Sequence, residues 1–503
     1  MKHLPFLARC CKHLRPILPL VVTAGGWIPV LHAADIGLPI VGKVQPRAAH
    51  EIAGSSWSVG GETIDRDFAI YQNYRNYLGP LGAKAIRLQA GWAKCEREPG
   101  IYTWAWLDEI VTDAIAQGVQ PWLELGYGNR VYPGGGGPGL GDGLPSSPEA
   151  LAAWDRWAKA LVERYKDRVQ VWEIWNEPDL ASAVRVTVDG YVGLYHRTAS
   201  IIRSQQTESR IIALALLGNI DFADQFLAGM QAKGRLDLID IITIHGYPRN
   251  PDDMTNIDRL QAVISKYGRA IEVRQGETGA PSRHQQQFAL KEISWTENLQ
   301  AKWNLRRMLA HRGRDVPFNL FTMIDLHYTH YHLQSGNALR MNFKGLLATN
   351  PDQTVAHAKP SYYAAQNVFS IFDHTLKRLL DYPFTSTSLR GVALTGYQNS
   401  AEGDQVVAYW INDAPPADSN GVTFINLTLA RGRFTEPVLV DLLTGMVYAL
   451  APASWEQRPD GVTFADLPVY DAPMLIAEKA VLHLEAARGQ SSAANQSQTN
   501  IVK

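Results

Sequence analysis

Short apolar segments alternate with amphipathic ones from about residue 51 to residue 376. Most of the apolar segments are rich in β-branched or aromatic residues, the pattern of strands that are buried on both faces. We predict eight such strands, at residues 52–59, 84–89, 121–125, 169–175, 211–217, 241–245, 271–275 and 319–324. Helices are expected between them, because apolar positions recur at helical spacing in segments such as 65–81, 295–311 and 361–372.

Eight strands that are each followed by a helix are typical of a (β/α)8 TIM barrel. A doubly wound open sheet is the alternative. No Gly-x-Gly-x-x-Gly motif follows an early strand, which favours the barrel.

After about residue 376 strand-like segments follow one another without helices, as in 405–410, 421–429 and 437–443. This pattern predicts an α/β barrel followed by a C-terminal β-sandwich domain. Four parts are therefore expected. They are a signal peptide at 1–34, the catalytic barrel at 35–376, the β-sandwich at 377–485, and a Ser/Gln/Asn-rich disordered tail at 486–503.

The first residues resemble an export signal, with four basic residues before an uncharged stretch from Ile17 to Leu31 and the small residues Ala33 and Ala34. We expect a bacterial periplasmic or secreted protein without stable membrane insertion after cleavage, since that stretch is too short to span a bilayer comfortably. Cys95 would be the one cysteine of the mature chain, so no internal disulfide is expected. The formal net charge of −1 singles out no nucleic acid partner, and the sequence indicates no particular oligomeric state.

Two predicted strands end on a glutamate within a short motif. Trp175-Asn176-Glu177-Pro178 ends the fourth strand, and Gly276-Glu277-Thr278-Gly279 ends the seventh. In a barrel, the carboxyl ends of all strands meet at one rim, where active sites lie. Strands four and seven are not neighbours, so the two carboxyl groups would face each other across that rim. Such a pair can cleave a glycosidic bond.

The stretch from Val171 to Asp179 (VWEIWNEPD) resembles the acid/base motif of clan A glycoside hydrolases, and family 39 is the most similar. Ile86-Arg87-Leu88, Trp92 and Gly100-Ile101-Tyr102 add to the resemblance, which covers roughly residues 51–376.

The resemblance implies a role for each matching residue. Glu177 corresponds to the general acid/base, and Glu277 to the nucleophile of a retaining double displacement. Asn176 corresponds to the residue that contacts the sugar 2-hydroxyl, and Arg87 to the arginine beside the nucleophile. His245 and Tyr247 end the sixth strand, where the family pattern has an aromatic hydroxyl that hydrogen-bonds the nucleophile; core packing is their alternative.

The sequence departs from the clan at the end of strand eight, where a tryptophan commonly forms a sugar platform. Here Thr322-Met323-Ile324-Asp325-Leu326-His327 follows instead. Trp295 is a candidate for the missing ring, and Asp325 and His327 are candidates for binding sugar hydroxyls. Trp92 is a further candidate platform, with core packing as the alternative.

Glu173 lies four residues before Glu177 on the same face of its strand, so we predict an ion pair inside the barrel, and the same holds for Glu124. His327, His330 and His332 have a spacing that could bind zinc. They lie in a loop, and a zinc site would leave the two glutamates without a role, so neither a metal nor another cofactor is expected. The glycine-rich stretch Gly134–Gly137 is predicted to be a mobile rim loop.

The sequence thus predicts an exported retaining β-glycosidase that acts on a poly- or oligosaccharide. Two alternatives are a non-catalytic carbohydrate-binding protein on a decayed barrel and a metal-dependent hydrolase that uses the three histidines. Degradation of external polysaccharide and trimming of an exported one both fit the sequence.

Overall fold

The computed structural model describes residues 34–182, 184–285, 287–328 and 340–485. Residues 1–33 of the predicted signal peptide, the predicted tail, His330 and His332 lie outside the described residues. Among the residues described, no helix is both long enough and apolar enough to cross a membrane.

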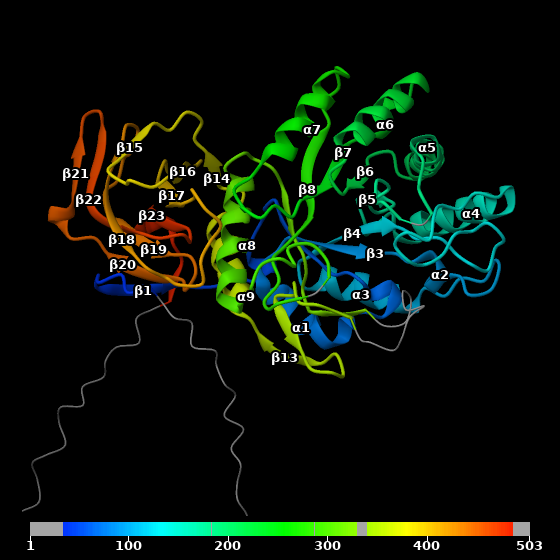
Figure 1. The fold of residues 1–503 in the computed structure, drawn as a ribbon, viewed down its shortest axis with the longest axis horizontal. Helices are drawn as coiled ribbons and strands as arrows, with labels where there is room; N and C mark the ends of the chain where they lie inside the picture. The colour runs from blue at the N-terminus through cyan, green and yellow to red at the C-terminus, as the bar shows by residue number, and fades with distance from the viewer. Residues whose placement is uncertain (1–33, 183, 286, 329–339, 486–503) are drawn as a thin grey trace, which may run out of the picture. The chain divides into compact units, whose positions relative to one another are not determined.

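Eight parallel strands form a closed barrel, in agreement with the predicted fold class, and each predicted strand overlaps an observed one (Figure 1). In chain order they are β2 (Trp57–Gly60), β3 (Ala85–Gln89), β4 (Gln120–Leu125), β5 (Val171–Ile174), β6 (Arg210–Leu216), β7 (Ile241–His245), β8 (Glu272–Thr278) and β9 (Phe318–Leu320). Parallel pairing of β2 with β9 closes the barrel, with Ser58 opposite Asn319.

Helices connect consecutive strands and cover the outside of the barrel. They are α1 (Tyr71–Leu81), α2 (Trp92–Cys95), α3 (Ala105–Ala116), α4 (Pro148–Tyr165), α5 (Val188–Gln205), α6 (Ile220–Ala232), α7 (Thr255–Ser265), α8 (Glu297–Arg312) and α9 (Pro360–Ile371). Helix α4 begins as the sequence predicts. Ser147 accepts a hydrogen bond from the backbone of Ala150 and Pro148 occupies the first turn, where its missing N–H has no cost.

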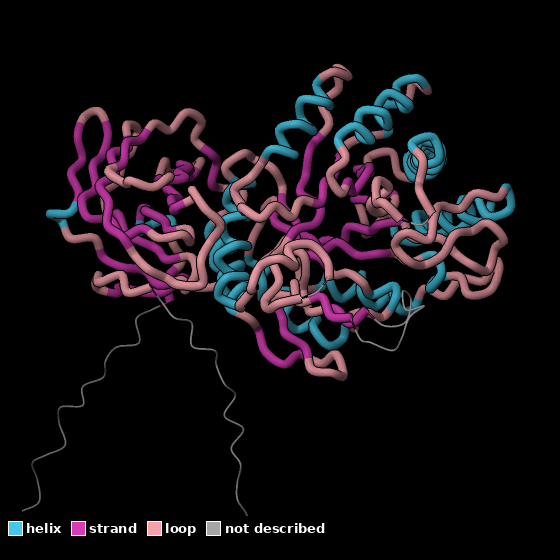
Figure 2. The backbone as a smooth tube through the Cα atoms, in the orientation of Figure 1, coloured by secondary structure: helices cyan, strands magenta, loops and turns pink. Residues whose placement is uncertain are grey.

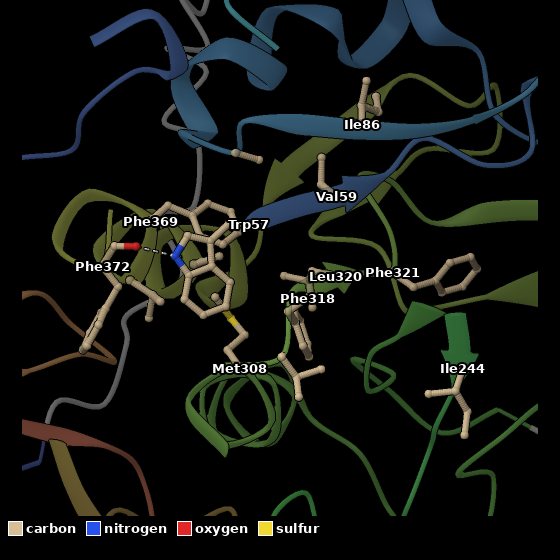
Figure 3. Close-up of a cluster of buried hydrophobic side chains, with 14 of the residues drawn as sticks. Trp57, Val59, Ile86, Ile244, Met308, Phe318, Leu320, Phe321, Phe369 and Phe372 are labelled. Atoms are coloured by element: carbon tan, nitrogen blue, oxygen red, sulfur yellow. Dashed lines mark hydrogen bonds between the residues drawn. The ribbon is translucent and has the colours of Figure 1, made fainter. Parts of the chain in front are cut away.

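Large apolar side chains from β2, β9, α8 and α9 pack together between the barrel strands and the helices. Trp57 packs against Phe318 and Phe369, and its ring N–H donates to the backbone oxygen of Phe372 at 2.7 Å (Figure 3). In Figure 3 the ring of Phe321 is set apart from this cluster, just beyond β9. The cluster holds the first and last strands of the barrel together.

Two antiparallel sheets follow the barrel, and loops rather than helices join most of their strands (Figure 2). One sheet has the order β14-β16-β17-β23-β19-β20-β1-β24 and the other β15-β18-β22-β21. The strands are β1 (Ile40–Val44), β14 (Leu376–Arg378), β15 (Phe384–Ser386), β16 (Val392–Asn399), β17 (Gln405–Ile411), β18 (Thr423–Leu429), β19 (Pro437–Asp441), β20 (Met446–Ala449), β21 (Trp455–Arg458), β22 (Gly461–Val469), β23 (Met474–Glu478) and β24 (Leu484–Glu485).

Strand β1 differs from the predicted domain division, which assigned residues 35–376 to the barrel. It lies between β20 and β24 in the C-terminal sheet, with Lys43 opposite both Met446 and Glu485. The physical reason is that the edge of β20 and the whole of β24 have backbone N–H and C=O groups that need partners. Strand β1 lies between them and supplies hydrogen-bond partners to both. No sequence pattern near residue 40 distinguishes this pairing from a strand of the barrel.

Two small antiparallel ribbons lie between β9 and α9. They pair β10 (Leu326–Tyr328) with β11 (Arg340–Asn342), and β12 (Leu347–Thr349) with β13 (Val355–Ala358). The segment after the last barrel strand is thus an inserted β structure rather than a simple loop.

Candidate active site

A cleft of about 420 Å³ opens at the rim formed by the carboxyl ends of the barrel strands. Its lining includes Glu177, Glu277, Asn176 and Tyr247, four of the residues that the sequence singled out. This is the rim at which the active sites of such barrels lie.

Backbone geometry sets the position of Glu177. Strand β5 ends at Ile174, three residues earlier than the glutamate, and the chain then turns with positive φ angles at Trp175 (68°) and Glu177 (48°). Side chains other than glycine rarely adopt this conformation, which costs about 1–3 kcal/mol at each residue. The turn is held by backbone hydrogen bonds from Trp175 to Leu125 and from Glu177 to Ala215, at 3.0 and 3.1 Å.

Asp179 strengthens the same turn from the other side. Its carboxylate accepts hydrogen bonds from the backbone N–H groups of Leu217, Gly218 and Asn219, which follow β6. These bonds join the loop after β5 to the loop after β6. The position of Glu177 is therefore fixed by hydrogen bonds between the loops after β5 and β6, in addition to strand β5 itself.

Glu277 lies within β8, and its side chain reaches the cleft with 14% of its surface exposed. The Tyr247 hydroxyl donates to Glu277 Oε1 at 2.6 Å, and Arg87 Nη1 donates to Oε2 at 3.3 Å. The close approach of Gly279 to the backbone of Phe321, where a Cβ would lie 2.1 Å from the carbonyl oxygen, explains why glycine follows the strand here.

The two glutamates meet in the cleft. One carboxylate oxygen from each and one ring nitrogen of His245 all lie within 4.8 Å of one another. His245 Nδ1 is 2.9 Å from Glu177 Oε1 and 3.6 Å from Glu277 Oε2. Burial lowers the pKa of His245, which favours the neutral ring. Its Nε2 atom is buried without a hydrogen-bond partner in the described part of the chain.

Arg87 is fully buried at the centre of a charged network. It lies within 3.3 Å of four carboxylates, those of Glu62, Glu124, Glu173 and Glu277. Glu124 and Glu173 each contact it at 2.6 Å, which confirms the ion pairs that strand alternation predicts.

Arg87 also positions Asn176, since its Nη2 donates to Asn176 Oδ1 at 2.7 Å. That bond occupies the acceptor of the amide. The Asn176 amide nitrogen is then the group left to donate into the cleft.

Burial gives Glu177 the properties of an acid. Only 8% of the residue is exposed, and loss of hydration raises the pKa of Glu177 to about 8, with Asp179 adding to the rise and Arg87 opposing it. Burial likewise raises the pKa of Glu62 to about 7. Both carboxyl groups can therefore hold a proton near neutral pH.

Glu177, His245 and Glu277 are also three donors that could approach a metal ion. Two features oppose this use. Tyr247 and Arg87 already donate to Glu277, and the raised pKa of Glu177 disfavours the deprotonated form that a metal ion requires. The residues fit proton transfer and charge stabilisation better than metal binding.

Four of the predicted substrate-binding residues are not brought to the cleft. Trp92 begins α2, is fully buried and stacks on Tyr132 and Trp157. Trp295 packs with Leu290 and Trp303 in a separate apolar cluster.

Asp325 and His327 are held by the inserted ribbons after β9. Asp325 pairs with Lys359 at 2.6 Å, and His327 Nε2 lies 2.7 Å from Thr349 Oγ1. Both side chains are buried, so these contacts are internal to the fold. The third and second histidines of the proposed zinc motif, His332 and His330, lie outside the described residues.

The cleft contains residues that sequence reasoning missed. Glu62 follows β2, Phe321 follows β9, and Lys344 lies between β11 and β12. Phe321 fell inside the predicted eighth strand, 319–324, whereas the observed β9 ends one residue before it, so its place at the rim depended on the exact strand end. Glu62 lies three residues after the predicted first strand, and no pattern marks Lys344.

The glycine-rich stretch after β4 is folded back on itself, with hydrogen bonds from Gly128 to Gly137 and from Asn129 to Gly135. A Cβ on Gly135 would lie 2.1 Å from the backbone oxygen of Asn129, so glycine allows this close packing. Leu140 from this loop lines the cleft, which makes the loop part of the rim.

A family model described as "Glycosyl hydrolases family 39" matches residues 93–277, a stretch that contains both cleft glutamates. No curated protein matches the chain. The resemblance to clan A glycoside hydrolases, with family 39 as the most similar, is therefore confirmed at the level of the family model.

Solved structures agree with this fold. A family 39 glycoside hydrolase from Bacteroides cellulosilyticus WH2 matches with a TM-score of 0.58 and 18% identity, over 84% of this chain and 81% of that one. A monomeric beta-xylosidase from Caulobacter crescentus CB15 has a TM-score of 0.54 at 17% identity, over 88% and 98%. A GH39 enzyme from Xanthomonas axonopodis pv. citri has a TM-score of 0.54 at 16% identity, over 88% and 96%. These matches show that the chain shares the fold of these enzymes, and the family model agrees with the resemblance to family 39 glycoside hydrolases.

Proposed function

We propose that the chain is a retaining β-glycosidase in which Glu177 is the general acid/base and Glu277 the nucleophile. The observation that carries this proposal is the distance between the two carboxyl groups, which have oxygens within 4.8 Å of each other. Retaining enzymes have their carboxyl groups about 5–5.5 Å apart, whereas inverting enzymes leave about 6.5–9.5 Å for a water molecule.

The first step forms a covalent intermediate. A carboxylate oxygen of Glu277 attacks the anomeric carbon as the bond from that carbon to the leaving oxygen breaks, and Glu177 gives its proton to that oxygen. Hydrogen bonds from Tyr247 and Arg87 stabilise the charge on Glu277 before the attack.

The second step releases the sugar. Glu177, now a carboxylate, takes a proton from a water molecule, whose oxygen attacks the anomeric carbon and displaces Glu277. Release of its proton in the first step is compatible with a pKa of about 8, because such a group changes charge readily near neutral pH.

Asn176 and Phe321 contribute to sugar binding in this proposal. The free amide nitrogen of Asn176 donates to the 2-hydroxyl, a contact that strengthens in the transition state. The Phe321 ring offers an apolar face to the sugar at the place where the clan commonly has a tryptophan. We further propose that the chain is exported by its N-terminal segment and acts on a polysaccharide or its fragments.

The test uses the variants Glu177→Ala and Glu277→Ala on a panel of aryl β-glycosides and polysaccharides. Each variant should lower kcat/KM by at least about a thousandfold. Azide should restore turnover of an activated substrate by both variants. The product should be the β-glycosyl azide with Glu177→Ala and the inverted α-glycosyl azide with Glu277→Ala.

Asp325→Asn is a control, because Asp325 is a buried carboxyl group outside the cleft. Full activity in either glutamate variant would contradict the assignment. Binding of glycans by the wild-type protein without any hydrolysis would support the carbohydrate-binding alternative, and loss of activity on chelation would support the metal-dependent one.

A further inference from the structure

Lys344 is a buried cation that lines the cleft. The residue is 1% exposed, and its Nζ atom lies 5.4 Å from the centre of the Tyr247 ring and 5.9 Å from that of Phe288. Tyr247 itself donates to Glu277, so Lys344 lies in the part of the cleft next to the proposed nucleophile.

Lys344 has no anionic partner among the described residues. No carboxylate oxygen lies within 4.0 Å of its Nζ atom in that part of the chain, and the stretch 329–339 that the structure leaves out contains no Asp or Glu. Arg66, the other cation that lines the cleft, differs in this respect because it pairs with Asp65 at 3.2 Å.

A buried charge without a partner is costly, and the two ring contacts offset only part of that cost. Burial accordingly lowers the pKa of Lys344 to about 7, and the charge of Glu277 opposes only part of this fall. A ligand that brings a negative charge next to Nζ would offset the cost of burying the ammonium group and would favour its charged form. A ligand with a negative charge can reach Lys344 through the cleft that this residue lines.

We propose that the sugar unit bound next to Glu277 is acidic, a uronic acid whose carboxylate pairs with Lys344. The inference rests on the proposed function, because it names the substrate class of the same cleft. The sugar carboxylate lies on C5 of the ring, away from the anomeric carbon. It can therefore contact Lys344 while the anomeric carbon faces Glu277.

An alternative is that Lys344 serves only to balance the charge of Glu277. Glu277 already receives hydrogen bonds from Arg87 and Tyr247, and Lys344 lies beyond ion-pair distance of it. This alternative predicts that removal of the lysine slows hydrolysis of every sugar equally. The acidic-sugar proposal predicts a change in the preference between sugars.

The experiment compares aryl β-D-glucuronide, β-D-glucoside and β-D-xyloside, which differ only in the group on C5, and also galacturonide with galactoside. The wild-type enzyme should prefer the uronide in at least one of these sets by about tenfold or more in kcat/KM. Lys344→Met should abolish that preference, because kcat/KM for the uronide should fall at least about tenfold further than kcat/KM for the neutral sugar. Lys344→Arg should keep part of the preference.

Lys94→Gln is the matched control, because Lys94 is a partly buried lysine that pairs with Asp67 and does not line the cleft. It should leave the preference unchanged. Thermal unfolding of each variant identifies those that fail to fold, and Lys344→Gln is a second neutral variant for that case.

Calorimetric binding of free glucuronate, galacturonate, glucose and galactose separates this inference from the proposed function. Tighter binding of a uronate that depends on Lys344, in a protein that hydrolyses nothing, would overturn the proposed function and leave the inference intact. Wild-type hydrolysis that favours neutral sugars in both sets, or an equal loss on acidic and neutral sugars in Lys344→Met, would overturn the inference alone. If neither hydrolysis nor uronate binding is detected, both are overturned.

Discussion

The two sides of the barrel rim use their buried charges differently. On the side of β3, β5, β7 and β8, Arg87 gathers carboxyl groups that reach the cleft, including Glu277. On the side that follows β9, Lys359 and Asp325 also form a buried ion pair, yet neither lines the cleft. A buried charge is thus evidence of a site only where its network ends on an exposed surface.

The difference has a structural cause. Side chains at the ends of regular barrel strands point into one rim, because their positions follow from strand alternation and register. The segment after β9 instead forms two ribbons, β10 with β11 and β12 with β13. Asp325 and His327 pair within this segment and its neighbours, whereas Lys344 of the same segment lines the cleft. Asp325 and His327 therefore stabilise the insertion.

Among the substitutions that test this comparison, Arg87→Lys should cause the largest combined loss of activity and stability. A lysine cannot contact Glu62, Glu124, Glu173, Asn176 and Glu277 at once, since it lacks the planar fork of donors. We expect kcat/KM to fall by about a hundredfold or more and the free energy of unfolding to fall by about 3–5 kcal/mol. Steady-state kinetics and urea unfolding measure the two losses.

Asp325→Asn tests the opposite side of the rim. It removes the charge that pairs with Lys359, so the free energy of unfolding should fall by a similar amount, about 3–5 kcal/mol. The folded fraction should keep kcat/KM within about threefold of the wild type. Equal losses of activity in the two variants would show that the distinction between the sides is wrong.

Phe321→Leu and Trp295→Leu test which aromatic ring contacts the sugar. Phe321 lines the cleft, whereas Trp295 packs in a separate cluster. Loss of the ring face at Phe321 should lower kcat/KM by about tenfold. Trp295→Leu should lower thermal stability and leave kcat/KM of the folded enzyme unchanged, and the reverse result would restore Trp295 as the platform.

Glu177→Gln should show the smallest effect, on the pH dependence of stability. Burial raises the pKa of Glu177 from 4.5 to about 8, so the folded state binds this proton more tightly than the unfolded chain does. The resulting stabilisation is full below pH 4.5 and is lost as the pH rises toward about 8. Glutamine has no such proton to lose.

Urea unfolding at several pH values between these limits measures the effect. The free energy of unfolding of Glu177→Gln should decrease less over this range than that of the wild type, by at least about 1 kcal/mol. Glu163→Gln, a surface substitution, is the control and should follow the wild type. Parallel curves for all three proteins would mean that Glu177 is ionised at neutral pH in the free enzyme.

The barrel and the residues on one side of its rim could be predicted from the sequence. The eight apolar segments have a period and length that buried parallel strands explain well. Arg87 lies within β3, Glu277 near the end of β8 and Glu177 in the turn after β5, and the positions of all three follow from that strand pattern. The contact from Tyr247 to Glu277 came from the family resemblance.

The other side could not be predicted in the same way. Trp295, Asp325 and His327 lie in or beside segments whose path depends on tertiary contacts, such as the pairing of Asp325 with Lys359 34 residues later. The burial of Lys344 could not be predicted, because no pattern in the surrounding sequence marks this residue as buried. The pairing of β1 is a similar case, since its partners are about 400 residues away.

That pairing of β1 has a consequence for how the molecule forms. Residues 40–44 pair with Leu484–Glu485, which are synthesised much later. The sheet therefore cannot be completed until residue 485 has been made, and contacts of such long range slow folding. Strand β1 therefore remains unpaired until β20 and β24 have been synthesised, and the C-terminal sheet is completed after synthesis of its last strand.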